Sequence, residues 1–338
     1  MNAGIDFAHY FHDTAYLLSI GFVHQALIAC ALLGLLSGIM TPLVVLRQMS
    51  FSVHATSELA LMGAAAALLF GFNLGAGAIA GAIAAAIVLA ILGFREQQDS
   101  AIGVVMSFGL GLSVLFIHLY PGNSTAAMSL LTGQIVGVSS TSTWILAFTT
   151  LLVAVVIMVI WRQLLFASAD PIMARAAGIP VRAISVIFAV LLGLAAAQSV
   201  QIVGALLVMA LLITPGAAAV QITSSPVRAV IYSIIFAETA AVGGLLLSLA
   251  PGIPVSVFVT SISFIIYLVC RAIGWAQSRT VLRDDVAARR STHSFAASQA
   301  ATTHEAHAIL PSETHHTEDQ HISEFPESCA HCEDPSDT

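Results

Sequence analysis

The 338-residue sequence contains no lysine, and only 9% of its residues are charged. Soluble domains carry charge on about a quarter of their residues, so this composition excludes an ordinary soluble globular protein. The missing lysine also excludes the phosphate-binding loop of ATPases, which requires a Gly-Lys-Ser or Gly-Lys-Thr step. Any ATP hydrolysis linked to this chain must therefore come from another protein.

Cysteine is also scarce, with four residues in the chain, and their placement does not suggest a disulfide framework. An intramembrane protease is not indicated either. The chain has no His-Glu-x-x-His motif, because His304-Glu305-Ala306-His307 has the wrong spacing, and it has no Gly-x-Ser-x-Gly elbow.

The chain is instead rich in long apolar runs, and 58% of its residues are hydrophobic. Each run is about long enough to cross a ~30 Å hydrocarbon core as a helix. The pattern predicts an all-α polytopic membrane protein with about nine transmembrane helices. We expect them near residues 26–46, 53–72, 74–94, 101–119, 144–161 (closed by Arg162), 183–197, 202–220 (broken at Thr214-Pro215), 229–249 and 254–270.

The arginines predict the orientation of these spans. If the N-terminus lies outside, every arginine falls on the cytoplasmic side, as the positive-inside rule requires. The arginines of the membrane portion are Arg47, Arg95, Arg162, Arg175, Arg182, Arg228 and Arg271. The sequence therefore predicts an N-out, C-in topology.

The chain divides into three predicted parts. Residues 1–24 mix aromatic residues with Asp and His, which predicts a segment lying in the membrane interface. Residues 25–275 form the transmembrane domain. Residues 276–338 hold four arginines against eleven acidic residues and few large apolar side chains, which predicts a disordered, His-rich cytoplasmic tail.

A short helix is predicted outside the membrane at residues 170–178, in the stretch DPIMARAAGIP. Asp170 suits the N-cap, Pro171 suits the first helical position, and Gly178 suits the position just beyond the C-terminus. The topology places this helix in the cytoplasm.

The most unusual stretch is Ser50–Gly63, which places His54 and Glu58 four residues apart in an apolar run. On a helix these two side chains share a face. Glu58 would lie ~16 Å from Arg47 along the helix, and ionisable residues at such depth are costly and are candidate functional sites. Imidazole with carboxylate suits zinc and also manganese. The alternative is a buried polar pair in which each side chain satisfies the other.

Two further residues are candidates for the same metal path. Glu238 lies at a similar depth and could be a second ligand, or it could hydrogen-bond a broken helix such as the one at Pro215. His118 lies near the predicted outer surface, where it could receive metal or serve as an ordinary interfacial anchor.

Five stretches together resemble the permease subunits of zinc/manganese/iron ABC importers. They are PLVVLRQMSF (42–51), DSAIGVVMS (99–107), LLTGQIVGVS (130–139), DPIMARAAGI (170–179) and IVGALLVMALLITPGAAA (202–219). They occur in the family's order and span residues ~25–275. Family members usually carry Gly-Asp-x-x-x-His-Ala where this chain has His54 and Glu58, so the carboxylate and imidazole have exchanged places.

The resemblance implies an ABC permease fold in a bacterial plasma membrane and no enzymatic activity in this chain. Its implied partners are two cytoplasmic ATPase subunits, an external metal-binding protein and a second copy of the permease. The helix at 170–178 resembles a coupling helix that docks on the ATPase, through Asp170, Pro171, Ala174, Arg175 and Gly178. Its alternative is a generic interfacial helix.

We therefore expect the membrane subunit of an ATP-driven importer of divalent metal, with zinc as the first expectation and manganese or iron as alternatives. A secondary transporter without an ATPase is the other alternative, although it leaves the cytoplasmic helix unexplained. No tightly bound cofactor and no nucleic acid partner are expected.

The His and Cys content of the tail predicts a second metal site, because His-rich and Cys/His tracts bind zinc. A single Cys-x-x-Cys supplies half of a four-ligand site, so a metal buffer and an inert tail both stay open. The candidate ligands are His304, His307, His315, His316, His321, Cys329, His331 and Cys332.

Overall fold

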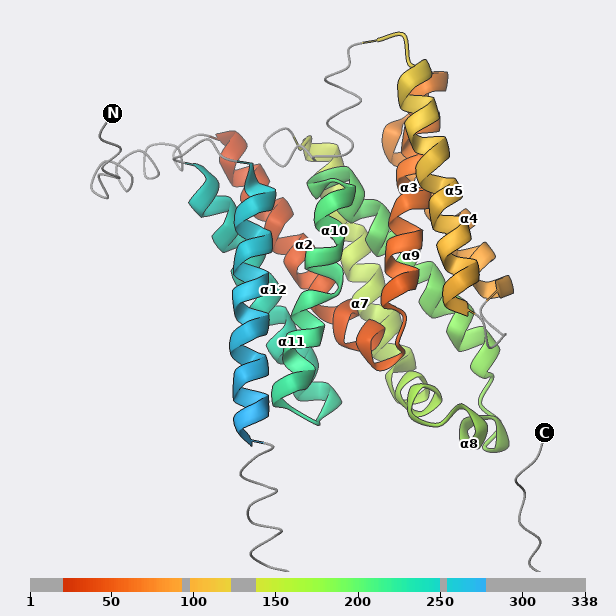
Figure 1. The fold of residues 1–338 in the computed structure, drawn as a ribbon, viewed down its shortest axis with the longest axis vertical. Coiled ribbons are helices and arrows are strands. Elements are labelled where there is room, and N and C mark those ends of the chain that lie inside the picture. Colours follow the sequence, from red (N-terminus) through yellow and green to blue (C-terminus); the bar gives the residue numbers. More distant parts are fainter. Residues whose placement is uncertain (1–20, 93–97, 123–137, 250–253, 278–338) are drawn as a thin grey trace, which may run out of the picture. The chain divides into compact units, whose positions relative to one another are not determined.

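The computed structural model describes residues 21–92, 98–122, 138–249 and 254–277, and its regular elements within these ranges are all helices (Figure 1). This confirms the predicted all-α class. The helices are α2 (Gly21–Leu46), α3 (Ser50–Phe70), α4 (Leu74–Leu92), α5 (Gln98–Leu119), α7 (Ser140–Ala169), α8 (Pro171–Ala176), α9 (Val181–Val203), α10 (Ala205–Leu212), α11 (Thr214–Ile222), α12 (Pro226–Leu249) and a last helix, Val255–Gln277, blue in Figure 1.

The first helix begins earlier than predicted, so residues 21–24 belong to α2 and not to the interfacial segment. The other residues of that predicted segment, 1–20, lie outside the described residues. The predicted tail also begins too early, because residues 276 and 277 belong to the last helix; its remaining residues lie outside the described ones.

Seven of the described helices are long and apolar enough to cross a membrane. Two shorter apolar stretches, Leu74–Leu89 and Leu207–Ile222, coincide with the predicted third and seventh spans. These helices agree with a polytopic membrane protein. The count of nine spans and the N-out, C-in orientation stay predictions.

The predicted end of the fifth span at Arg162 is wrong, because α7 continues to Ala169 and is 30 residues long. Arginine is a good helix former and does not end a helix by itself. Beyond Arg162, Leu164 and Ala167 are buried, so packing against the rest of the fold stabilises the extension.

The break predicted at Thr214-Pro215 is present, since α10 ends at Leu212 and α11 carries Pro215 in its first turn. The break before α10 differs from the prediction. We expected the sixth span to end near residue 197, but α9 continues to Val203, and Gln198 is buried within it. Gly204, with φ of 79°, then turns the chain in a conformation that glycine adopts readily.

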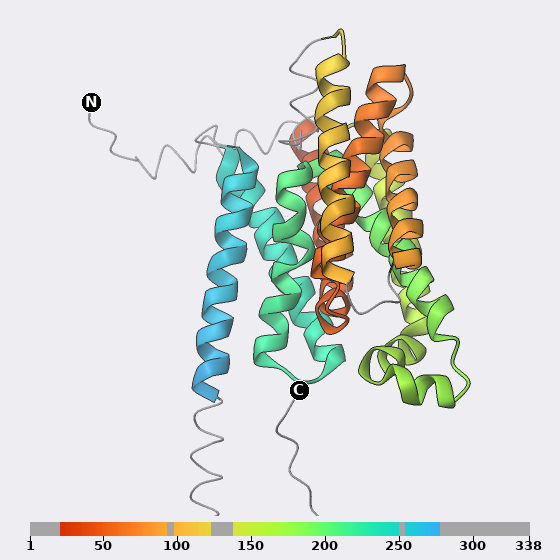
Figure 2. The same ribbon diagram turned by 45° about the vertical axis from the view of Figure 1, so that its right-hand side comes forward.

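Close helix contacts depend on glycines, which allow two helix backbones to approach each other. A Cβ placed on Gly38 of α2 would lie 2.5 Å from Cα of Ile234 on α12. A Cβ placed on Gly63 of α3 would lie 2.9 Å from Cα of Gly81 on α4. α3, α4 and α5 lie side by side in both ribbon views (Figures 1 and 2).

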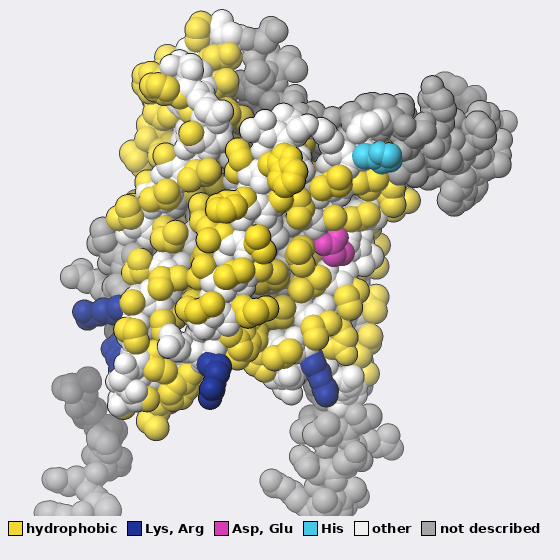
Figure 3. All heavy atoms as spheres, turned by 180° about the vertical axis from the view of Figure 1, so that it is seen from behind, with side chains coloured by type: hydrophobic (Ala, Val, Ile, Leu, Met, Phe, Trp, Pro, Cys, Tyr) yellow, Lys and Arg dark blue, Asp and Glu magenta, His cyan; other side chains and the backbone are white. Residues whose placement is uncertain are grey.

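Positive charge on the face drawn in Figure 3 is concentrated at one end of the helices. Figure 3 shows arginine side chains at the lower end of a face that is otherwise largely apolar. The short helix α8 lies at the lower end in Figure 1 as well. This arrangement agrees with the clustering of arginines that the sequence predicts.

Candidate functional site

The helix that carries the predicted metal ligands is enclosed by its neighbours. α3 packs against α4, α5 and α9, and it buries polar residues as well as apolar ones. Its small hydroxyls bond within the helix: Thr56 Oγ1 donates to Ser52 O (2.6 Å), and Ser57 Oγ donates to His54 O (2.7 Å). These hydroxyls are therefore satisfied and do not compete for the imidazole or the carboxylate.

His54 and Glu58 face each other on α3, as their spacing predicts. Nδ1 of His54 lies 3.9 Å from Oε1 of Glu58, and the two side chains are 32% and 9% exposed. This separation is too long for a hydrogen bond. His54 Nδ1 and Glu58 Oε2 are both buried without a hydrogen-bond partner among the described residues. The pair therefore does not satisfy itself in this conformation.

The separation fits two ligands of one metal ion. Ligand bonds of ~2.1 Å to imidazole nitrogen and to carboxylate oxygen can together span up to about 4.2 Å. A cation between His54 Nδ1 and Glu58 Oε1 would give the buried Nδ1 the partner that it lacks among the described residues. The donor set of one nitrogen and one oxygen does not by itself choose between zinc and manganese.

The structure does not join the other two candidates to this pair. Among the described residues there is no group of three or more His, Cys, Asp or Glu side chains that could hold a metal. Glu238 lies on α12 against Gly34 of α2, where a Cβ on the glycine would be 3.0 Å from the Glu238 Cδ. His118 is exposed at the end of α5. Both stay predictions as ligands elsewhere on a path.

A glycine of α5 packs against the backbone of α3 at Glu58 and against the neighbouring Leu59 side chain. A Cβ on Gly109 would be 3.1 Å from Leu59 Cδ2 and 3.6 Å from the carbonyl carbon of Glu58. The sequence pattern did not single out this residue, because a glycine inside an apolar run does not indicate which helix it meets.

The short helix after α7 has the predicted caps. The Asp170 carboxylate accepts hydrogen bonds from Ile172 N and Met173 N, each at 2.9 Å. Gly178 adopts φ of 79° just beyond the helix. Ile172 is 79% exposed and Met173 is 58% exposed, whereas Ala174 is buried. The helix therefore presents apolar side chains on its free side.

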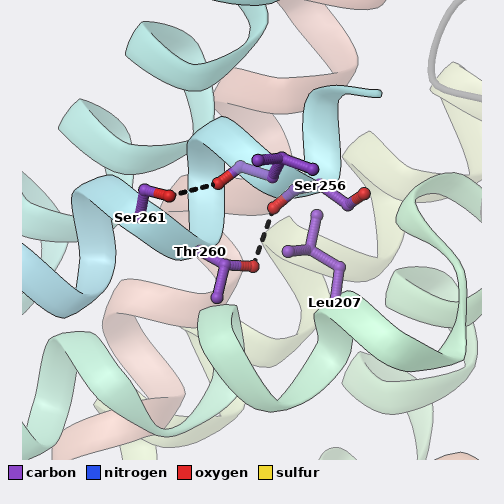
Figure 4. A pocket seen from close by; sticks show the side chains of 5 residues that line it. Leu207, Ser256, Thr260 and Ser261 are labelled. Carbon is purple, nitrogen blue, oxygen red and sulfur yellow. Dashed lines mark hydrogen bonds between the residues drawn. The ribbon is translucent and has the colours of Figure 1, made fainter. Parts of the chain in front are cut away.

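A hollow of about 350 Å³ lies elsewhere, between α10 and the last helix, beside Leu207, Ser256, Thr260 and Ser261 (Figure 4). Thr260 Oγ1 donates to Ser256 O and Ser261 Oγ donates to Val257 O, both at 2.7 Å. Because the lining residues include no His, Cys, Asp or Glu, the hollow is not a candidate metal site. The predicted tail ligands, from His304 to Cys332, lie outside the described residues.

Comparison with known proteins identifies the family of this chain. Residues 19–274 match the ABC 3 transport family. The manganese transport system membrane protein MntC of Halalkalibacterium halodurans is 32% identical over 69% of this chain and 80% of its own length. MntC of Listeria innocua is 32% identical over 75% of this chain and 92% of its own length.

A solved structure gives the same result. PsaBC from Streptococcus pneumoniae in complex with Fab has a chain that is 28% identical, with a TM-score of 0.70 over 78% of this chain and 95% of that one. These findings confirm the resemblance to ABC importer permeases that the five sequence stretches indicate. The chain therefore belongs to the ABC 3 transport family, as a multi-pass membrane permease and not as an ATP-hydrolysing subunit.

Proposed function

We propose that this chain is the membrane permease of an ATP-driven importer of divalent metal ions, with manganese as its cargo. The observation that carries the proposal is the His54–Glu58 pair, whose Nδ1 and Oε2 atoms are buried and have no hydrogen-bond partner among the described residues. Ionisable groups inside a membrane span are costly, and such positions commonly mark ion paths.

Manganese replaces zinc as the favoured cargo because the similar permeases from H. halodurans and L. innocua are named as manganese transport proteins. The expectation of zinc depended partly on the His- and Cys-rich tail, which lies beyond the residues that match the family. The donor pair itself accepts either metal.

The pair can serve as a transient site for the ion. A cation that has lost water needs ligands inside the membrane, and the Glu58 carboxylate also offsets its charge. Two protein ligands leave other coordination positions for water, so the ion is held loosely enough to leave. Alternating access would then open the path first to the outside and afterwards to the cytoplasm.

Energy would come from a separate ATPase that docks on α8. The exposed Ile172 and Met173 side chains provide an apolar contact surface, and the Asp170 cap stabilises the first turn of the helix. An external metal-binding protein and a second permease copy complete the proposed assembly. The tail is proposed as a cytosolic metal-binding segment that is separate from the path.

The proposal is tested by transport in vesicles that contain the permease and its cognate ATPase. ATP-dependent uptake of manganese is expected to exceed uptake of zinc and iron. Glu58→Gln and His54→Ala should each lower manganese uptake at least about tenfold, as loss of groups at metal sites does. His24→Ala removes an exposed histidine of α2 and is the matched control.

A double variant, His54→Asp with Glu58→His, restores the usual family order and should recover uptake if the ligand types matter more than their order. Normal uptake in both single variants would refute the path. Equal uptake without the ATPase would support a secondary transporter instead.

A further inference from the structure

Arg47 makes a contact that its role as a topology marker does not explain. It lies between α2 and α3, and its Nη2 donates to Ser185 Oγ of α9 at 2.7 Å. Its Cζ also lies 5.0 Å from the centre of the Phe188 ring. Ser185 and Phe188 are three residues apart, so they share one face of α9. The guanidinium therefore holds one surface of α9 through two contacts.

The turn that carries Arg47 leads directly into the metal-site helix. Arg47 N donates to Leu43 O, and Met49 N donates to Val44 O, both at 3.0 Å. Val53 N then donates to Met49 O at 3.1 Å, so hydrogen bonding is continuous from this turn into α3. α3 begins at Ser50, just after this turn, and His54 lies one turn further along the helix. A shift of the Arg47 side chain would therefore move the start of α3 as a unit.

The other end of the contact leads to α8. Ile179 N donates to Ala174 O and Gly178 N donates to Arg175 O, both at 3.0 Å. α9 begins at Val181, and Ser185 lies one turn further on. Hydrogen bonds thus connect α8 with the segment that leads into α9. A displacement of α8 would therefore be transmitted through these hydrogen bonds to the first turns of α9, where Ser185 lies.

The energetics do not favour a purely stabilising role for Arg47. Burial lowers the pKa of its guanidinium, although arginine stays protonated at neutral pH. Its Nη1 is buried without a hydrogen-bond partner among the described residues, and an unsatisfied buried donor is costly. Arg47 therefore carries an energetic cost beside its two contacts with α9.

We infer that Arg47 is a positioning residue that transmits movement from α8 and α9 to the start of α3, and so to His54 and Glu58. This inference rests on the proposed function, because it concerns how an ATPase at α8 would act on the metal pair. Arg47 itself does not touch the ion. It fixes where the two ligands stand relative to α9.

The test uses the full permease with its ATPase in vesicles and measures manganese uptake and ATP hydrolysis in the same sample. Arg47→Ala should lower the manganese moved per ATP about tenfold, because a charge-assisted hydrogen bond and a cation–π contact are lost. ATP hydrolysis should stay within about twofold of the wild type. Manganese binding to the detergent-solubilised permease should not change.

Three further variants separate coupling from folding. Ser185→Ala removes one hydroxyl and should lower the manganese moved per ATP about threefold, because a modest hydrogen bond contributes a factor of about this size. Arg47→Lys keeps the charge but lacks the planar group that stacks on Phe188, so its ratio should lie between those of the wild type and Arg47→Ala. Arg228→Ala removes an exposed arginine of α12 and is the control.

If Arg47→Ala moves as much manganese per ATP as the wild type, the inference is overturned. Uptake and hydrolysis that fall together in Ser185→Ala would overturn it too, because that result indicates a structural role. A wild-type complex without ATP-driven manganese uptake would instead refute the proposed function.

Discussion

The cap of α8 allows a quantitative prediction about ATPase binding. α8 has six residues, and helices this short are not stable by themselves in water. Asp170→Ala removes the hydrogen bonds to Ile172 N and Met173 N. Loss of an N-cap costs ~1 kcal/mol, and loss of a negative charge at a helix N-terminus costs a further ~0.3–1 kcal/mol. If the ATPase binds the folded helix, its affinity should fall about tenfold to thirtyfold.

The measurement is the dissociation constant of the ATPase for the permease in lipid nanodiscs. Asp170→Asn is the matched variant, because asparagine caps helices about as well as aspartate and lacks only the charge. It should bind within about fivefold of the wild type, because it loses only the contribution of the negative charge at the helix N-terminus. Wild-type affinity in Asp170→Ala would refute the reasoning, as would equal losses in the two variants.

Two other predictions concern helix packing and the tail. Gly63→Ala places a methyl group 2.9 Å from Cα of Gly81 and should destabilise the fold by ~1–3 kcal/mol, seen as a lower melting temperature. Gly103→Ala has no atom within 4 Å of its new Cβ and should melt at or above the wild-type temperature; equal melting of the two variants would contradict the packing argument. Deleting residues 278–338 should lower the zinc bound per purified chain, while manganese uptake stays within about twofold; unchanged zinc content would mean an inert tail.

Local chemistry made parts of the fold predictable from the sequence. The caps of α8 depend on Asp170 and Gly178 alone, so the sequence was sufficient to place this helix. The spacing of His54 and Glu58 was likewise sufficient to put them on one face of α3. Neither prediction needed knowledge of a distant contact.

Features that depend on tertiary packing could not be predicted. The extension of α7 past Arg162 reflects burial of Leu164 against other helices. The contact between Arg47 and Ser185 joins residues 138 positions apart. From the sequence, Arg47 could be identified only as a positive charge at the end of a span, and its partner on α9 could not be identified. The 3.9 Å separation of the metal pair also needed atomic positions.

The close packing around α3 also limits how metal preference can change. Gly63 and Gly109 meet their neighbours at distances that leave no space for another carbon atom without a shift of the surrounding atoms. Larger or smaller side chains in the walls are therefore a poor means of reshaping the site, since interiors tolerate such changes badly. The accessible alternative is to exchange the proposed ligands themselves along one helix, and the order of His54 and Glu58, which is reversed relative to the order that the family resemblance predicts, would be an exchange of this kind. An engineer who wishes to redirect this permease to another ion should begin with those two positions and leave the walls unchanged.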